Sequence, residues 1–414
     1  MQPVNPVLLR RGFAVEALLA PQQAVVAFFS RVGVCAPAVE HVALEEARGR
    51  VLAEAVSAGE DYPNAPRSAM DGFALLSSAT PGSFDIEGEV RMGEAPGSLS
   101  PGRAVKIATG GTLPAGADAV VPIEDAVLRG DVVRVAAPVE AGENVVPCGA
   151  DMRAGERLLE AGRRIGAAQI GLLATLGVVQ VPVYRRPLVA VLSSGDELVD
   201  PHLRPARGQV RDSNRYAVAA SLVAMGALPK HYPTLPDEAD PFEAALVRAL
   251  RECDGVVVTG GSSVGERDRL PAAVARVASP GVVVHGLRLR PGKPTLLGAD
   301  GGKPILGLPG NPASALMMLE AVCAPIVGAL CGAPVPRAEV SARLAQPARS
   351  RAGWTWYLPV RLEDDAEGPL AHPFALRSFS VSLLGRADGY VVMGERDEEW
   401  PAGMPVTVHR FAGG

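Results

Sequence analysis

The spacing of apolar positions changes along the chain. Residues 21–35 and 42–56 place apolar side chains three and four positions apart, which predicts two amphipathic helices. Between residues 60 and 185, short apolar runs alternate with Gly and Pro, as is typical of a compact β-rich unit. The stretch 164–177 interrupts this pattern and predicts a short helix that ends at Gly177.

A regular alternation of strands and helices begins at residue 187. Buried strands are predicted by apolar runs such as PLVAVLSS and DGVVVTGG, and helices by the segments SNRYAVAASLVAMGA, PFEAALVRALREC and NPASALMMLEAVCAPIVGAL. This alternation predicts a doubly wound α/β domain with a mostly parallel sheet. From about residue 333 short strand patterns return, so we expect a small β domain at the end of the chain.

Composition and charge narrow the functional classes. The chain is 48% hydrophobic and 21% charged, which suits a protein with buried cores and a charged surface. The formal net charge is −5 and no basic tract occurs, so we expect no nucleic-acid partner. No apolar run reaches the roughly eighteen residues of a membrane span, so we expect no membrane partner either. Residues 1–20 are expected to form a flexible N-terminal extension.

The five cysteines include no CxxC pair, which argues against a zinc knuckle or a disulfide framework. Cys253 and Cys323 lie in apolar helical patterns and are expected to be small core residues. Such cysteine usage predicts a reduced, cytoplasmic compartment.

Five loops follow predicted strands of the α/β region, where an open α/β sheet binds its ligands. They contain Gly, Pro and polar residues, and they span 193–197, 235–238, 259–265, 290–294 and 308–312. One such loop is an ordinary turn, but five at the same edge of one sheet predict a binding pocket.

The loops favour phosphate chemistry. The 259–265 loop can present backbone N–H groups and hydroxyls to a phosphate, although it is neither a P-loop nor a GxGxxG turn. Asn311 and Pro312 fit the N-cap and first position of a helix, whose N-terminus favours anions; an ordinary capped helix fits them equally well. Arg290 and Lys293 add positive charge.

Carboxylates occur in two regions. Glu197, Asp237 and Asp268 lie at the rim of the predicted sheet, where they suggest a phosphorylated ligand held with Mg²⁺; a solvated loop position is an equal alternative for each. In the β-rich region Asp71 precedes Gly72, and nothing local separates a turn residue from a catalytic carboxylate there.

These segments resemble the molybdopterin molybdenumtransferase family, which includes bacterial MoeA and the E domain of gephyrin-type proteins. Seven motifs occur in the family's order: SAMDGFA, TGGTLPAGADAVVPIED, SSGDEL, GQVRDSN, TGGSSVGERD, RPGKP and LPGNPASA. They cover roughly residues 60–320, and the closing region with Ser378 and ADGYVV also fits.

The resemblance implies a multidomain α/β protein. A molybdopterin-binding domain would span 186–332, an elongated discontinuous linker domain 21–62 and 141–185, a β-rich insertion domain 63–140 and a C-terminal β domain 333–414. It also implies a homodimer whose active site lies between the α/β domain of one subunit and the β-rich domain of the other. Molybdopterin adenylyltransferase and molybdoenzyme or chaperone proteins are the partners it suggests.

In the family, adenylylated molybdopterin and molybdate react with Mg²⁺ present, AMP leaves, and the dithiolene binds molybdenum. Carried over by motif, the functional polar set is Asp71, Thr109, Asp151, Glu197, Asp237 and Asp268, with Glu197, Asp237 and Asp268 as metal ligands. The ligand-binding set is Ser194, Gly195, Asp212, Gly260, Gly261, Ser262, Ser263, Gly265, Arg290, Pro291, Gly292, Lys293, Pro309, Gly310, Asn311, Pro312 and Ser378. We assign no general acid or base, because metal-assisted P–O cleavage mainly needs positioning and charge neutralisation.

The chain departs from the family pattern at four positions. Members commonly have Asn where this chain has Arg67. The usual N-[IV]-R-x-x-G-E-D is here 144–151, with Val146 in place of Arg and Ala150 in place of Glu, and Pro359 replaces a frequent arginine of the last domain. Losing two arginines near an oxyanion site either weakens molybdate binding or marks a paralogue that uses tungstate or another adenylylated or phosphorylated substrate. A non-catalytic scaffold is a further alternative, which the carboxylate set argues against.

Overall fold

The computed structural model describes residues 18–261, 269–374 and 380–412. The chain forms two compact units: Met1–Ala53, Gly162–Ile170 and Val179–Gly414 make up the first, and Glu54–Ala161 with Gly171–Val178 the second.

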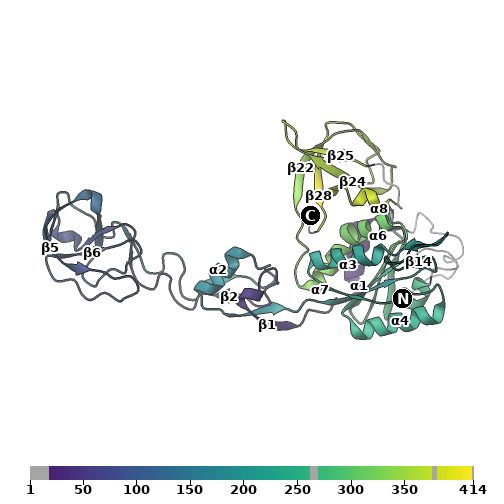
Figure 1. Ribbon diagram of the computed structural model, residues 1–414, viewed down its shortest axis with the longest axis horizontal. Helices are drawn as coiled ribbons and strands as arrows, with labels where there is room; N and C mark the ends of the chain where they lie inside the picture. Colours follow the sequence, from purple (N-terminus) through teal and green to yellow (C-terminus); the bar gives the residue numbers. More distant parts are fainter. Residues whose placement is uncertain (1–17, 262–268, 375–379, 413–414) are drawn as a thin grey trace. The chain divides into compact units, whose positions relative to one another are not determined.

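The first unit contains a six-stranded sheet that carries the predicted loops (Figure 1). Its strand order is β16 (Leu228–His231), β13 (Leu188–Ser193), β17 (Gly255–Thr259), β21 (Lys303–Leu308), β20 (Leu296–Asp300) and β18 (Pro280–His285). The strands β16, β13, β17 and β21 are parallel, and β20 runs antiparallel to β21 and β18. The expected mostly parallel sheet is therefore confirmed, with one antiparallel strand.

Side-chain alternation along the strands builds a core on each face of this sheet. In β13, Val189 and Val191 pack with α1 (Pro21–Arg31) and α3 (Asn214–Met225). Ala190 and Leu192, which point the other way, pack with α4 (Ala239–Glu252) and α5 (Leu270–Val277). In Figure 1, α4 lies on one side of the sheet and α3 on the other. The domain is doubly wound, as the strand–helix alternation predicts.

The apolar helical segment after β21 has an internal irregularity. It comprises α6 (Pro312–Met318), a π-helical turn (Leu319–Cys323) and α7 (Ala324–Cys331). The stretch Pro312–Cys331 is long and apolar enough to cross a membrane, but 78% of its apolar window is buried inside the protein. It therefore packs as a core helix, and its buried Glu320 accepts hydrogen bonds from the Ser221 hydroxyl and, at 3.1 Å, from the Ala412 amide.

The helix predicted for residues 42–56 is wrong. The structure has β1 (Val39–Ala43), a short 3₁₀ turn (Leu44–Glu46) and β2 (Val56–Ser57) there. β1 pairs antiparallel with β12 (Gln180–Tyr184), because long-range strand pairing overrides the local helical spacing. The helix predicted from residue 21 is confirmed as α1; although expected to begin the linker, it places Ala24 and Phe28 in the α/β core.

The second unit is β-rich, as predicted. Its sheet has the order β7 (Ala119–Pro122), β4 (Gly72–Leu75), β6 (Arg103–Ile107), β5 (Gly82–Glu89), β9 (Val132–Val135) and β8 (Ala126–Arg129). The unit also has two separate two-stranded ladders: β3 (Arg67–Ser68) with β10 (Val145–Val146), and β2 with β11 (Arg157–Leu159). The predicted short helix is α2 (Ala167–Thr175), and Gly177 just beyond it has a φ of 71°.

The C-terminal region forms the expected small β domain. The strands β24 (Thr355–Glu363), β25 (Leu370–Pro373), β22 (Glu339–Leu344), β28 (Pro405–Arg410) and β26 (Gly389–Met393) pair in that order, and β26 closes the ring by pairing with β24. The remaining elements are β14 (Leu198–Val199) with β15 (Val210–Arg211), β23 (Ala348–Arg349) with β27 (Glu399–Trp400), and α8 (Val381–Leu384). A strand from the α/β domain, β19 (Leu289–Arg290), adds in parallel to β24. The predicted pocket loop 290–294 thus begins at a docking point between the two domains.

Candidate functional site

The five loops predicted to form a pocket lie at one edge of the α/β sheet. Five strands end at this edge: β16, β13, β17, β21 and β18. The first four are parallel, and β18 has the same direction because it pairs antiparallel with β20, which is itself antiparallel to β21. Backbone hydrogen bonds join neighbouring loops: the Ser194 amide donates to the Thr259 carbonyl (3.0 Å), and the Gly195 amide donates to the Leu235 carbonyl (3.2 Å). The described parts of the loops therefore lie at this edge as predicted, although 290–294 follows β19, which pairs with the C-terminal sheet.

Gly260 allows the closest of these approaches. Its φ is 87°, and a Cβ there would lie 2.3 Å from the Ser194 carbonyl oxygen. A Cβ on Gly310 would lie 3.6 Å from the Gly260 Cα, so three loops meet at this point. Asn214 at the start of α3 adds a fourth contact, because its side-chain amide Nδ2 donates to the Gly310 carbonyl at 2.8 Å.

Oxygen ligands gather on the two loops that follow β13 and β16. The Ser194 hydroxyl donates to Asp237 Oδ1 (2.8 Å), and the Asp237 amide donates to Asp196 Oδ1 (3.1 Å). The Glu197 carboxylate lies over Gly195, where a Cβ would come within 2.7 Å of Glu197 Oε2. Sequence reasoning missed Asp196, although it stands between two predicted site residues.

This donor set suits a hard cation but does not enclose one by itself. In the part of the chain that the structure describes, no group of three His, Cys, Asp or Glu residues is placed to hold a metal ion. Mg²⁺ is commonly bound by one or two carboxylates together with substrate phosphates, so Glu197 and Asp237 fit that pattern. The predicted ligand Asp268 lies outside the described residues, as do Ser262, Ser263, Gly265 and Ser378.

Asp212 is almost fully buried, with 1% of its surface exposed. Its carboxylate accepts the Arg215 amide (3.1 Å) and lies 3.6 Å from the Arg215 Nε. These contacts order the start of α3, so Asp212 supports the helix end that carries Asn214.

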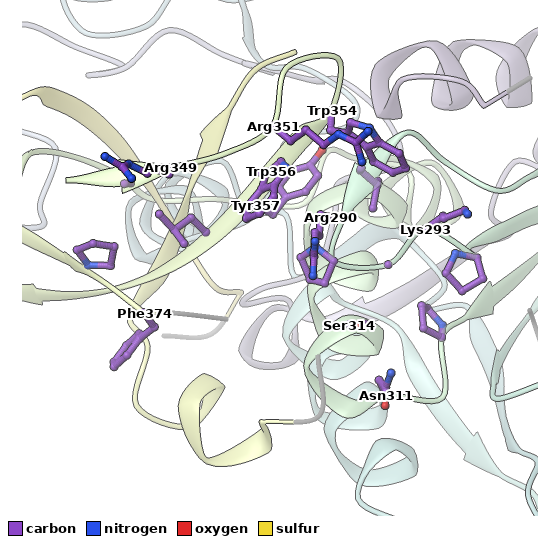
Figure 2. Close-up of a pocket in the computed structure, with 18 of the residues that line it drawn as sticks. Arg290, Lys293, Asn311, Ser314, Arg349, Arg351, Trp354, Trp356, Tyr357 and Phe374 are labelled. Atoms are coloured by element: carbon purple, nitrogen blue, oxygen red, sulfur yellow. The ribbon is translucent and has the colours of Figure 1, made fainter. Parts of the chain in front are cut away.

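A cavity of about 970 Å³ lies between the α/β domain and the C-terminal β domain. The α/β domain contributes Arg290, Pro291, Gly292, Lys293, Pro294, Pro309, Asn311 and Ser314; the β domain contributes Arg349, Arg351, Trp354, Trp356, Tyr357 and Phe374, among others. The Arg290 guanidinium lies over the Trp356 ring, 5.2 Å from its centroid. Figure 2 shows Arg290 between the aromatic side chains of the β domain and the start of α6.

Local backbone geometry shapes this cavity. Gly292 has a φ of 108°, and a Cβ there would lie 2.3 Å from Met318 Cγ, so only glycine fits. Asn311 occupies the N-cap position of α6 as expected, but its side chain does not make the capping hydrogen bond. The predicted residues Arg290 to Lys293, Pro309 and Asn311 are thus brought together, whereas Gly260, Gly261 and the carboxylates are absent from the cavity lining described.

Sequence reasoning missed the aromatic wall of this cavity. The chain is only 4% aromatic, yet three aromatic residues lie within four positions: Trp354, Trp356 and Tyr357. This local concentration is the sequence feature that could have indicated a binding surface. Aromatic faces beside Arg290 and Lys293 suit a planar ring that carries a negative charge.

The second unit brings Asp71 and Thr109 together, as the carried-over motifs imply. The Thr109 amide (2.7 Å) and hydroxyl (2.9 Å) both donate to Asp71 Oδ1. The hydrogen bond from the Thr109 amide, followed by the bond from its hydroxyl, holds the pKa of the Asp71 carboxyl below its ordinary value. Gly72 fixes the local backbone, since a Cβ there would lie 2.0 Å from the Val121 carbonyl oxygen. Asp151 is exposed, and its amide donates to the Tyr62 carbonyl (3.0 Å).

Three family models match successive parts of the chain: the MoeA N-terminal region (domain I and II) over residues 15–177, a probable molybdopterin-binding domain over 190–329, and the MoeA C-terminal region (domain IV) over 341–411. A molybdopterin molybdenumtransferase of Nostoc is 36% identical over 306 residues, 71% of this chain and 70% of the relative. That of Bacillus subtilis is 30% identical over 383 residues, 89% of each chain.

A solved structure agrees over nearly the whole chain. The crystal structure of a molybdopterin biosynthesis MoeA protein from Pyrococcus horikosii is 31% identical and matches 96% of this chain and 100% of its own with a TM-score of 0.83. With its three matched regions and its full-length relatives, the chain belongs to the MoeA family of molybdopterin molybdenumtransferases.

Proposed function

We propose that this protein acts in molybdenum-cofactor biosynthesis by inserting molybdate into adenylylated molybdopterin, with release of AMP. The observation that carries the proposal is the cavity in which Arg290 lies over Trp356, beside Lys293 and the N-terminal end of α6. Its aromatic walls suit a pterin or adenine ring, and its cations and helix end suit the phosphate joined to that ring.

Magnesium is the cofactor that the oxygen ligands favour. Asp237 and Glu197 can each supply a carboxylate oxygen, and Asp268 is the third ligand that we propose on motif grounds. When bound, Mg²⁺ would neutralise charge that develops on the phosphate as AMP leaves. The protein's own part is to position the ligand: Ser194 orients Asp237, and Gly260 lets the loops approach closely.

A homodimer with a shared site is the assembly that we propose. Asp71 and Thr109 belong to a different compact unit from Glu197 and Asp237. A two-fold interface that joins one unit of each subunit would complete two identical sites. Cytoplasm is the proposed compartment, which the five free cysteines favour. A molybdopterin adenylyltransferase before the reaction and molybdoenzymes or chaperones after it are the proposed partners.

The test is to incubate the protein with adenylylated molybdopterin, molybdate and Mg²⁺ and to follow AMP. We expect AMP release that depends on both molybdate and Mg²⁺. Release with tungstate but not molybdate would indicate a diverged paralogue. Ligand binding without any release would indicate a scaffold. Either result would overturn the proposal.

Subunit complementation tests the shared site. Asp71→Ala and Glu197→Ala chains are each expected to be inactive, and random exchange would place about half of the dimers in the mixed state with one intact site. About a quarter of the wild-type activity should therefore return on mixing. If subunit exchange is shown to occur and activity stays at the level of the parents, the two residues do not serve one site across the interface.

A further inference from the structure

Four arginines lie around a small pocket in the first unit, at the edge of the α/β sheet where β13 and β16 begin. This edge is opposite the one that carries the predicted ligand loops. The lining includes the four arginines Arg50, Arg164, Arg185 and Arg186. The C-terminal ends of α3 and α7 also reach the pocket, at Gly226 and Cys331. We refer to it as the arginine pocket.

Two of the four guanidinium groups are paired with carboxylates. The Arg50 side chain is only 10% exposed and forms an ion pair with Glu40. Its Nε is nevertheless buried and has no acceptor among the described residues. Arg185 donates two hydrogen bonds to Asp254, at 2.9 and 3.0 Å. Both carboxylates are therefore already occupied by one arginine each.

The guanidinium groups of Arg164 and Arg186 form no ion pair with a carboxylate in the described part of the chain. Arg164 Nη1 donates to the Gly49 carbonyl at 3.0 Å, whereas Nη2 of the same side chain is buried without an acceptor there. The adjacent Cys331 thiol supplies no negative charge, because burial raises its pKa to about 11. Buried N–H groups normally bond to protein, water or a ligand, so these arginines favour an added acceptor.

Charge also favours an anion in the arginine pocket. Glu40 and Asp254 neutralise two of the four arginines. The ends of α3 and α7 contribute about half a negative charge each. Roughly one positive charge is left in a partly buried position, where water screens it less than at the open surface.

The size of the pocket limits the ligand. Its volume is about 10 Å³, which is roughly the space that one water molecule needs. A nucleotide or pterin ring is too large for this volume. An oxyanion can place one oxygen inside and keep its other oxygens toward the exposed Arg186. Arginine forks suit such paired oxygens.

We propose that the arginine pocket binds a small tetrahedral oxyanion of the phosphate or sulfate type. The anion accepts hydrogen bonds from Arg164 and Arg186 and joins the end of β12 to the ends of α3 and α7. It is a structural ligand, separate from any anion held in the cavity beside Arg290.

Titration calorimetry with sodium phosphate at constant ionic strength tests the proposal. The cavity beside Arg290 also suits phosphate, so the titrations use the full chain carrying Arg290→Ala, and one phosphate should bind per chain. Arg186→Gln should raise the Kd about ten- to a hundredfold, because a charge-assisted hydrogen bond is lost. Adding Arg164→Gln should abolish measurable binding. Arg163→Gln, which changes an exposed neighbour outside the described lining, should keep the Kd within about twofold.

Each variant is first shown by circular dichroism to fold like the wild type. Arg186 is exposed, so Arg186→Gln tests the site without disturbing the packing around Arg164. Absence of phosphate binding in the Arg290→Ala protein, an unchanged Kd in Arg186→Gln or an equal loss in Arg163→Gln would each overturn the proposal. Sodium sulfate should compete with phosphate, and competition by sodium chloride at the same ionic strength would overturn the assignment to an oxyanion. No AMP is measured, so the result does not depend on the proposed function.

Discussion

Alanine substitutions at the adjacent glycines Gly260 and Gly261 would measure how much the close approach of the α/β loops contributes to stability. Both have positive φ, 87° and 62°. Replacing either by alanine incurs the cost of the left-handed conformation, about 1–2 kcal/mol. At Gly260 the new Cβ would clash with backbone, since it would lie 2.3 Å from the Ser194 carbonyl oxygen. At Gly261 the nearest heavy atom of the described residues, the Arg269 nitrogen, would lie 3.7 Å from the new Cβ.

Relieving the contact at Gly260 requires the two loops to move apart. That movement strains the hydrogen bond from the Ser194 amide to the Thr259 carbonyl (3.0 Å) and the bond from the Gly260 amide to the Leu308 carbonyl (3.3 Å). Each contributes about 1 kcal/mol net. Gly260→Ala should therefore lower the free energy of unfolding by about 3–4 kcal/mol, against about 1–2 kcal/mol for Gly261→Ala.

Urea unfolding can follow the domains separately. All three tryptophans, at positions 354, 356 and 400, lie in the C-terminal region, so their fluorescence reports on the β domain. Far-UV circular dichroism reports mainly on the helices, most of which belong to the α/β domain. We expect Gly260→Ala to lower the circular-dichroism midpoint more than Gly261→Ala and to reduce AMP release further. Equal destabilisation by both, or a greater loss at Gly261, would refute the argument from close approach.

Three further predictions follow from individual contacts. Thr109→Val removes one of the hydrogen bonds that lower the pKa of Asp71, so the acid limb of the kcat/KM profile should move to higher pH. Burial raises the pKa of Glu320 above 4.5, so stability should fall as pH rises from there through the folded-state pKa; Glu320→Gln should remove that slope in unfolding measured against pH. Trp356→Ala removes the ring under Arg290 and should raise the Kd of AMP about five- to thirtyfold by calorimetry.

Each of these has a control within the chain. Thr109→Ser keeps the hydroxyl and should retain the wild-type acid limb; a shift equal to that of Thr109→Val would count against the hydroxyl. An unchanged pH slope in Glu320→Gln would show that another group titrates in that range. Trp400 is in the same domain but outside the described cavity lining, so Trp400→Ala should leave AMP affinity as it is. Equal losses in both tryptophan variants would exclude a specific role for Trp356.

The α/β domain, and the sheet edge at which its loops lie, could be predicted from sequence because both follow from residue patterns within short segments. Strands of continuous apolar residues and amphipathic helices alternate at short spacing, and parallel strands place their carboxyl ends at one edge. Loops such as 193–197 and 308–312 were therefore expected at the same edge, and the structure brings both against Gly260 of the loop between them. The Asp71–Thr109 pair came from motif resemblance, because nothing in the local pattern joins two residues of different loops.

Long-range pairing decided the rest. The spacing of residues 42–56 predicts a helix, yet β1 is a strand because β12, far along the chain, offers it a partner. The cavity exists because β19 adds to β24 and sets Arg290 over Trp356, residues 66 positions apart in sequence. The pattern of apolar and polar residues within one segment does not determine which distant strand that segment pairs with, or in which register. Register likewise turned two separate departures from a motif, at Arg67 and Val146, into cross-strand neighbours, since pairing is set by backbone hydrogen bonds between segments that fold together.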